Sequence, residues 1–269
     1  MDLDLRMIVL GAVQGLCEFL PVSSSGHLAL LQAFFGLGQE GLLAFDLLLH
    51  CATVLAVLIF FRKGIATLAK GWIWGCVSSA GRSSEGWRWG WAILLACAAT
   101  ALIGLSLKGG AERMMASPLA VGCGLLTTAA ILALVPLIPE RGAALTWKTA
   151  LVVGIAQGLA VLPGVSRSGA SIVAGLLMGL AVGDAFRFSF LISIPAILGA
   201  SLLEGMEIHR PGAAALPEGW PLAVAVAFVL GWLSLKAMRR LVLSGKWAWF
   251  GLYCLLVGSV AILSTVDIF

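Results

Sequence analysis

The sequence predicts an all-α polytopic membrane protein, because its composition, its apolar runs and an internal repeat all favour a helical bundle in a bilayer. Of the 269 residues, 61% are hydrophobic and 11% are charged, whereas a soluble domain carries about 25% charged residues. No stretch has the alternation of a transmembrane β-strand. The net charge of +4 is no signal for nucleic acid, since basic residues in a membrane protein report its orientation.

Six continuous apolar segments are long enough to be transmembrane helices, which need about 20 residues to cross the hydrocarbon core. They cover residues 43–61, 89–107, 117–138, 186–203, 221–237 and 247–265. Two further apolar regions, residues 7–35 and 149–181, are interrupted by PVSSSGH and PGVSRSGAS. Non-helical backbone at membrane depth is tolerated only inside protein or beside a water-filled cavity. We therefore predict two re-entrant helical hairpins whose polar tips meet inside the bundle.

The two interrupted regions resemble one another, which predicts an inverted repeat. GAVQGLCEFLPVSSSG (residues 11–26) aligns with GIAQGLAVLPGVSRSG (residues 154–169), and polar residues agree as well as apolar ones. Three predicted spans follow each copy, and this odd number of crossings inverts the second copy relative to the first. The chain is thus predicted to be one integral membrane domain, residues 1–269, with repeat 1 at about 1–138 and repeat 2 at about 149–269.

The basic residues predict the orientation of the spans. Twelve fall on one side of the predicted spans and four on the other. The twelve are Arg62, Lys63, Lys70, Arg82, Arg88, Arg141, Lys148, Arg187, Lys236, Arg239, Arg240 and Lys246. Cytoplasmic loops carry the excess of Lys and Arg, so both termini are expected to face the outside.

Ionisable and hydroxylic side chains gather in the two predicted tips. They are Gln14, Glu18, Ser23, Ser24, Ser25 and His27 in the first, and Ser166, Arg167, Ser168 and Ser171 in the second. A charged group at membrane depth costs about 2.5–3.5 kcal/mol. An ion pair between Glu18 and Arg167 that joins the two halves would explain both charges, but it would leave the surrounding hydroxyls unexplained.

This combination of residues favours an anion, above all a phosphate. Gly/Ser turns lead into apolar helices, whose first N–H groups attract negative charge, and Arg167 is suited to clamp phosphate oxygens. Glu18 would repel a phosphate, so it is expected to act as a base, to orient His27 or a serine, or to bind a bridging cation. Serine, histidine and glutamate together suffice for nucleophilic phosphoryl transfer. His50, early in the span 43–61, either faces this site or is a hydrogen-bonded packing residue.

At these residues the chain resembles the undecaprenyl-diphosphate phosphatases of the bacitracin-resistance type. The first motif of that family stands here as QGLCEFLPVSSSGH and the second as PGVSRSGAS. The similarity continues through FDLLLHCATVLAVLIFFRK and FSFLISIPAILGAS. The resemblance implies a diphosphatase that removes the terminal phosphate of undecaprenyl diphosphate. Its product, undecaprenyl phosphate, is the recycled lipid carrier for peptidoglycan synthesis, and the activity confers resistance to bacitracin.

The resemblance also implies a location and a set of site residues. It implies a multi-pass protein of the bacterial cytoplasmic (inner) membrane with periplasmic termini, a periplasmic site, and a divalent cation such as Mg or Ca. The expected catalytic residues are Glu18, Ser24, His27 and Arg167, with Glu18 also the metal ligand. The expected substrate-binding residues are Gln14, Ser23, Ser25, Ser166, Ser168, Ser171 and His50. Gln14 replaces the first glutamate of many members, which removes one carboxylate from a metal site.

The sequence leaves the mechanism and one other class of function open. Either Ser24 attacks the terminal phosphorus, or Glu18 or His27 activates a water directly. Inverted repeats with broken helices that point at an anion are also typical of transporters, so a lipid-phosphate flippase or an anion transporter is the alternative. Glu18 and His27 beside three serines favour chemistry. A polyprenyl diphosphate lipid and the membrane are the expected partners, and a homodimer is one option for the assembly.

Overall fold

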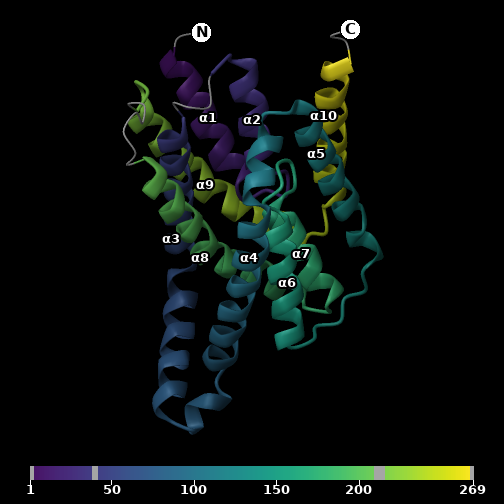
Figure 1. Cartoon of the computed structure of the whole chain (residues 1–269). Helices are drawn as coiled ribbons and strands as arrows, with labels where there is room; N and C mark the ends of the chain where they lie inside the picture. The colour runs from purple at the N-terminus through teal and green to yellow at the C-terminus, as the bar shows by residue number, and fades with distance from the viewer. Residues whose placement is uncertain (1–2, 38–41, 209–215, 267–269) are drawn as a thin grey trace.

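The computed structural model describes residues 3–37, 42–208 and 216–266, which form a bundle of helices (Figure 1). In chain order the helices are α1 (Leu3–Cys17), α2 (Ser24–Phe34), α3 (Leu43–Val77), α4 (Glu85–Met115), α5 (Pro118–Ala133), α6 (Trp147–Leu159), α7 (Arg167–Leu177), α8 (Val182–Ile208), α9 (Trp220–Leu243) and α10 (Ala248–Val266). Within these ranges there is no strand, and six helices are long and apolar enough to cross a membrane. The predicted all-α polytopic class is therefore confirmed.

Helices α3 and α4 are longer than the spans predicted from the sequence. Helix α3 has 35 residues, which corresponds to about 52 Å at 1.5 Å per residue. Arg62 and Lys63 end the apolar run without ending the helix, because both residue types are good helix formers. The end of α3 and the start of α4 project from the bundle, opposite the side of the molecule where α1 begins and α10 ends (Figure 1).

Each interrupted region folds as two short helices that turn back on one another. Helices α1 and α2 extend from the end of the molecule where the chain starts, and α6 and α7 extend from the other end (Figure 1). The two regions touch, since Ser168 Oγ at the start of α7 donates to Leu20 O in the segment between α1 and α2 at 3.2 Å. A Cβ atom on Gly26 would lie 2.9 Å from Gly164 Cα, so this approach requires glycine. The shape fits the expected hairpins, and their depth in a bilayer stays a prediction.

Aligned residues of the two interrupted regions have the same local roles, which supports the predicted repeat. Ser23 and Ser166 are the N-caps of α2 and α7, and each hydroxyl accepts a hydrogen bond from the backbone N–H three residues later. Ser24 and Arg167 are consequently the first residues of the two helices. Equivalent positions thus carry a hydroxyl in one half and a guanidinium group in the other.

Aligned glycines let the first helix of each half lie closely against a helix of the other half. Gly11 of α1 faces the carbonyl of Ala223 in α9, and Gly154 of α6 faces the carbonyl of Ala96 in α4. A Cβ atom at either glycine would overlap that backbone. Small residues of this kind bring helices into close contact in membranes, where packing replaces the hydrophobic driving force.

We expect Gly154→Val to destabilise the protein by about 1–3 kcal/mol, because the added side chain must push α6 away from α4. Thermal unfolding in detergent would measure this loss. Gly104→Val is the matched control, since nothing lies within 4 Å of a Cβ atom at that helical glycine. Equal melting temperatures for the two variants would contradict the predicted close contact.

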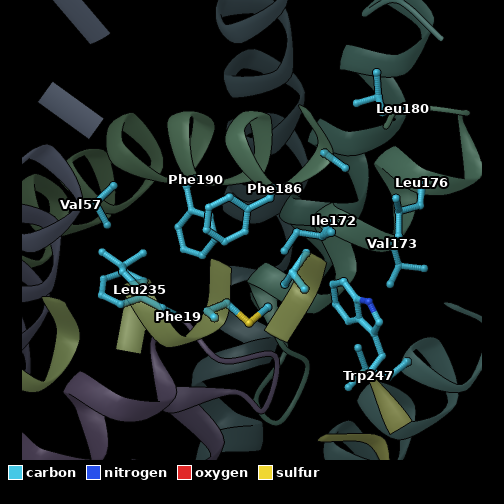
Figure 2. Close-up of a cluster of buried hydrophobic side chains, with 14 of the residues drawn as sticks. Phe19, Val57, Ile172, Val173, Leu176, Leu180, Phe186, Phe190, Leu235 and Trp247 are labelled. Atoms are coloured by element: carbon cyan, nitrogen blue, oxygen red, sulfur yellow. The ribbon is translucent and has the colours of Figure 1, made fainter. Parts of the chain in front are cut away.

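Phe19 anchors the first connecting segment in a cluster of buried hydrophobic side chains (Figure 2). It is 1% exposed, and its ring centroid lies 5.7 Å from that of Phe190 in α8. Figure 2 shows Phe186 and Ile172 in the same cluster, from α8 and α7. Because Phe19 is fixed in this way, the neighbouring Glu18 is held where the two halves meet.

Candidate active site

Glu18 lies at the centre of the polar contacts between the two halves. Its side chain is 4% exposed, and its Oε2 accepts hydrogen bonds from Ser24 Oγ at 2.5 Å and Gln14 Nε2 at 3.2 Å. Its Oε1 lies 3.5 Å from Arg167 Nη2. A buried carboxylate needs such charged and hydrogen-bonding partners. The structure therefore brings together Glu18, Ser24, Gln14 and Arg167, as the sequence predicted.

The local sequence explains how each of these groups reaches the site. Gln14 is in the last turn of α1, so a spacing of four residues points it toward Glu18 just beyond that helix. Ser24 and Arg167 are at the N-termini of α2 and α7, where unpaired N–H groups and the helix dipole favour an anion. Two helix starts and one guanidinium group consequently face the same place from opposite halves.

Ser23 has a backbone conformation that L-residues rarely adopt. Its φ is 69°, and no other non-glycine residue in the described ranges has a positive φ. Such conformations cost roughly 1–3 kcal/mol and cluster at functional sites. Ser23 Oγ caps α2 and lies 3.3 Å from Ser25 Oγ. The described contact of Ser25 is thus with Ser23, and both serines shape the turn that presents Ser24.

The serines of the second half make contacts mainly with the scaffold. Ser166 Oγ lies 3.2 Å from Ser168 Oγ, and Ser168 holds the first connecting segment as described above. Ser171 Oγ donates to Arg167 O at 2.7 Å and lies 2.6 Å from Ser189 Oγ in α8. These bonds orient the start of α7, and substrate binding by these serines stays a prediction.

His50 is the histidine that faces Glu18. Its Nδ1 lies 2.8 Å from the carbonyl oxygen of Asp46, one turn earlier in α3. A carbonyl only accepts, so Nδ1 carries the hydrogen. Nε2 then points to the site, 4.0 Å from Glu18 Oε2. The structure thus places His50 beside the carboxylate, as one of the two interpretations of the sequence expected.

His27 has a different set of partners. Its Nδ1 lies 2.7 Å from Ser23 O, and its Nε2 lies 2.8 Å from Tyr253 Oη of α10. One of the roles that the sequence left open for Glu18 was to orient His27, but among the described residues both ring nitrogens of His27 have other hydrogen-bond partners, and Glu18 holds Ser24 instead. Tyr253 was missed by sequence reasoning. A tyrosine hydroxyl within an apolar span needs a hydrogen-bond partner, and this requirement could have indicated that Tyr253 contacts a polar residue of the site.

A small pocket lies between the Glu18–Arg167 pair and α8. Its lining residues are Glu18, Phe19, Gln157, Arg167, Ser168, Ser189, Phe190 and Ser193. Gln157 Nε2 donates to Thr100 Oγ1 at 3.1 Å, while its Oε1 is buried without a hydrogen-bond partner in the described part of the chain. Ser189 and Ser193 were not predicted as site residues, although both are hydroxyls one turn apart in an apolar span.

Fold and site together define a class: helical membrane proteins that hold an acid, a hydroxyl and a guanidinium group between two helix hairpins. Such a set can bind a phosphate and activate an oxygen nucleophile. The chain belongs to the family described as bacitracin resistance protein BacA, which matches residues 7–260.

Curated relatives of the chain carry one common name. The undecaprenyl-diphosphatase of Desulfosudis oleivorans is 42% identical over 265 residues, which cover 95% of this chain and 96% of that protein. The undecaprenyl-diphosphatase of Methanosphaera stadtmanae is 39% identical, with 97% and 98% covered. That of Bacteroides fragilis is 40% identical, with 95% and 96% covered. The similarity therefore includes both interrupted regions and all six long helices.

Proposed function

We propose that this protein is an undecaprenyl-diphosphatase, which hydrolyses undecaprenyl diphosphate to undecaprenyl phosphate and phosphate. The observation that carries the proposal is the buried Glu18, which accepts from Ser24 Oγ at 2.5 Å and lies 3.5 Å from Arg167. Relatives that span nearly the whole chain have this activity in their names. The product is the lipid carrier for peptidoglycan synthesis, and its recycling confers resistance to bacitracin.

The proposed reaction uses the contacts of Glu18. Arg167 and the N-termini of α2 and α7 bind the diphosphate. Ser24 Oγ attacks the terminal phosphorus while its proton passes to Glu18. The bond from phosphorus to the bridging oxygen breaks, and its electron pair leaves with undecaprenyl phosphate. Water then hydrolyses the phosphoserine, with His27 in acid–base support. In the rival route Glu18 or His27 activates water for direct attack.

A divalent cation, Mg or Ca, is part of this proposal. Within the described residues no three His, Cys, Asp or Glu side chains gather, and Glu18 supplies the one carboxylate of the site. This set fits a cation held by Glu18 together with the substrate's phosphate oxygens, which is the way proteins commonly bind Mg²⁺. The cation would neutralise phosphate charge during the reaction.

We place the protein in the bacterial cytoplasmic (inner) membrane with periplasmic termini. The start of α1 and the end of α10 lie at one end of the molecule (Figure 1), and the basic segment from Arg62 to Arg88 lies at the other. This separation agrees with an excess of positive charge on the cytoplasmic side. The termini themselves, residues 1–2 and 267–269, are outside the described residues. The homodimer stays a prediction that light scattering of the purified protein would check.

Purified protein in detergent should release phosphate from undecaprenyl or farnesyl diphosphate. Glu18→Ala and His27→Ala should lower the rate by about 10²–10⁴-fold, the usual contribution of a general acid or base. EDTA should abolish the reaction, and added Mg or Ca should restore it. Glu112→Ala is the matched control, since this carboxylate is 57% exposed and its described ion pair is with Lys108, one turn earlier in α4.

The same assay separates the enzyme from a transporter. A wild-type protein that binds the diphosphate but releases no phosphate would refute the phosphatase. Lipid translocation in vesicles would then test the flippase or anion transporter, since Arg167 and the two helix starts suit anion binding without chemistry.

A further inference from the structure

The hydroxyl of Tyr253 is a hydrogen-bond partner of His27, and it comes from a helix outside both sequence motifs. The two rings are stacked, with centroids 5.5 Å apart and planes inclined by 6°. Tyr253 Oη lies 2.8 Å from His27 Nε2. Tyr253 is the one tyrosine in the sequence, and it lies on α10, at the opposite end of the chain from His27.

These contacts decide which nitrogen of His27 carries the hydrogen. The Ser23 carbonyl, 2.7 Å from Nδ1, can only accept, so Nδ1 is the donor. In the neutral ring Nε2 is therefore the acceptor, and the Tyr253 hydroxyl donates to it. His27 is 8% exposed, so bulk water has little access to replace this donor.

Helix α10 is held rigidly enough to position the hydroxyl. It packs closely along α5, where a Cβ atom on Gly258 would lie 2.9 Å from Gly122 O. Helix α5 in turn packs on α2, since Val121 and Ala29 share one hydrophobic cluster. Beside Tyr253, the thiol of Cys254 lies 3.8 Å from Pro21 O in the first connecting segment. The distance between α10 and the turn before His27 is thus set by packing on both sides.

We propose that Tyr253 is a positioning residue for His27. The Ser23 carbonyl fixes the hydrogen on Nδ1, and the Tyr253 hydroxyl holds Nε2 and so the ring orientation until Nε2 exchanges that bond for the water of phosphate release. This inference rests on the proposed function, in which His27 gives acid–base support. Tyr253 acts through His27 and makes no bond to the reacting atoms. Partners that orient a metal-ligating histidine contribute about 10–100-fold, and we expect the same range for a partner that orients His27.

The test is Tyr253→Phe, which keeps the stacked ring and removes only the hydroxyl. We expect kcat to fall by about 10–100-fold with KM unchanged, because Tyr253 makes no contact with substrate in the proposal. ¹⁵N NMR of histidine-labelled protein should show His27 Nε2 as a hydrogen-bonded acceptor in the wild type and a changed Nε2 signal in the variant. The His27 signal is assigned by its loss in His27→Ala.

Trp249→Phe is the matched control on the same helix, since Trp249 is an exposed aromatic residue. It should leave kcat and the His27 signal unchanged. A Tyr253→Phe protein that keeps either the wild-type kcat or the wild-type His27 signal overturns the inference. If His27→Ala is inactive in the same experiment, the proposed function still holds. A fully active His27→Ala overturns the inference through the role of His27. A wild type that releases no phosphate refutes the proposed function, and the inference with it.

Discussion

Replacing Ser24 by alanine is expected to lower kcat by at least about 10³-fold, since the variant lacks the oxygen that forms the covalent intermediate. Ser24 is the one hydroxyl in the described ranges that donates to Glu18, at 2.5 Å, and it is at the first position of α2. Its proton therefore has an acceptor in place before the reaction starts. Phosphate release at saturating substrate measures the effect, and acid quenching with labelled diphosphate would trap a phosphoserine in the wild type.

Two controls separate this chemical role from a structural one. Ser106→Ala removes a hydroxyl that donates to Ile103 O at 2.8 Å in an exposed part of α4, and it should leave turnover nearly unchanged. Ser24→Ala also leaves Glu18 without one donor, which costs about 1–3 kcal/mol of stability, so melting temperatures must be compared. Near-full turnover of Ser24→Ala would refute the covalent route and favour direct attack by a water that Glu18 activates.

Replacing Arg167 is expected to have a second large effect. Arg167→Ala should lower kcat by about 10³–10⁵-fold, which is the range for an arginine that stabilises a transferred phosphoryl group. Arg167→Lys keeps the charge but loses the planar fork that binds two phosphate oxygens at once, so it should recover only part of the rate. Arg113→Ala is the matched control, because its described hydrogen bond joins Nε to Gly109 O within an exposed part of α4.

Stability has to be measured for the Arg167 variants, because Arg167→Ala leaves the buried Glu18 without its cation. Removing one partner of a buried pair destabilises a protein through the charge that remains. The double variant Arg167→Ala/Glu18→Gln should therefore melt at a higher temperature than Arg167→Ala and still be inactive. A single variant that releases phosphate at the wild-type rate would show that Arg167 does not bind the reacting phosphate.

The sequence predicted most of the fold because the decisive signals are local. Pro21 and Gly26 interrupt the first apolar region, and Pro163 and Gly164 the second, so both breaks could be predicted without tertiary information. The end of α3 could not be predicted in this way, since Arg62 ends the apolar run that is long enough to cross the hydrocarbon core but permits the helix to continue. Hydropathy marks where a segment leaves the membrane, and helix propensity decides where the helix stops.

The candidate site was predictable only where its residues belong to the two motifs. Glu18, Ser24 and Arg167 were expected to meet because both tips had to be buried together. The partners of His27 and His50 depend on how α10 and α3 rotate about their axes, and that is set by side-chain packing across the whole bundle. For that reason Tyr253 was missed and the orientation of His50 was left open.

The equivalence of Ser24 and Arg167 has a consequence for the origin of the enzyme. An ancestor assembled from two identical subunits would place the same residue at both positions, so its centre would hold two hydroxyls or two guanidinium groups. A nucleophile opposite a phosphate clamp arises only when each position mutates independently, which requires two copies of the coding sequence. Duplication thus precedes this division of labour. The resulting asymmetry also matches a substrate whose two ends differ, with a free phosphate at one end and an isoprenoid chain at the other.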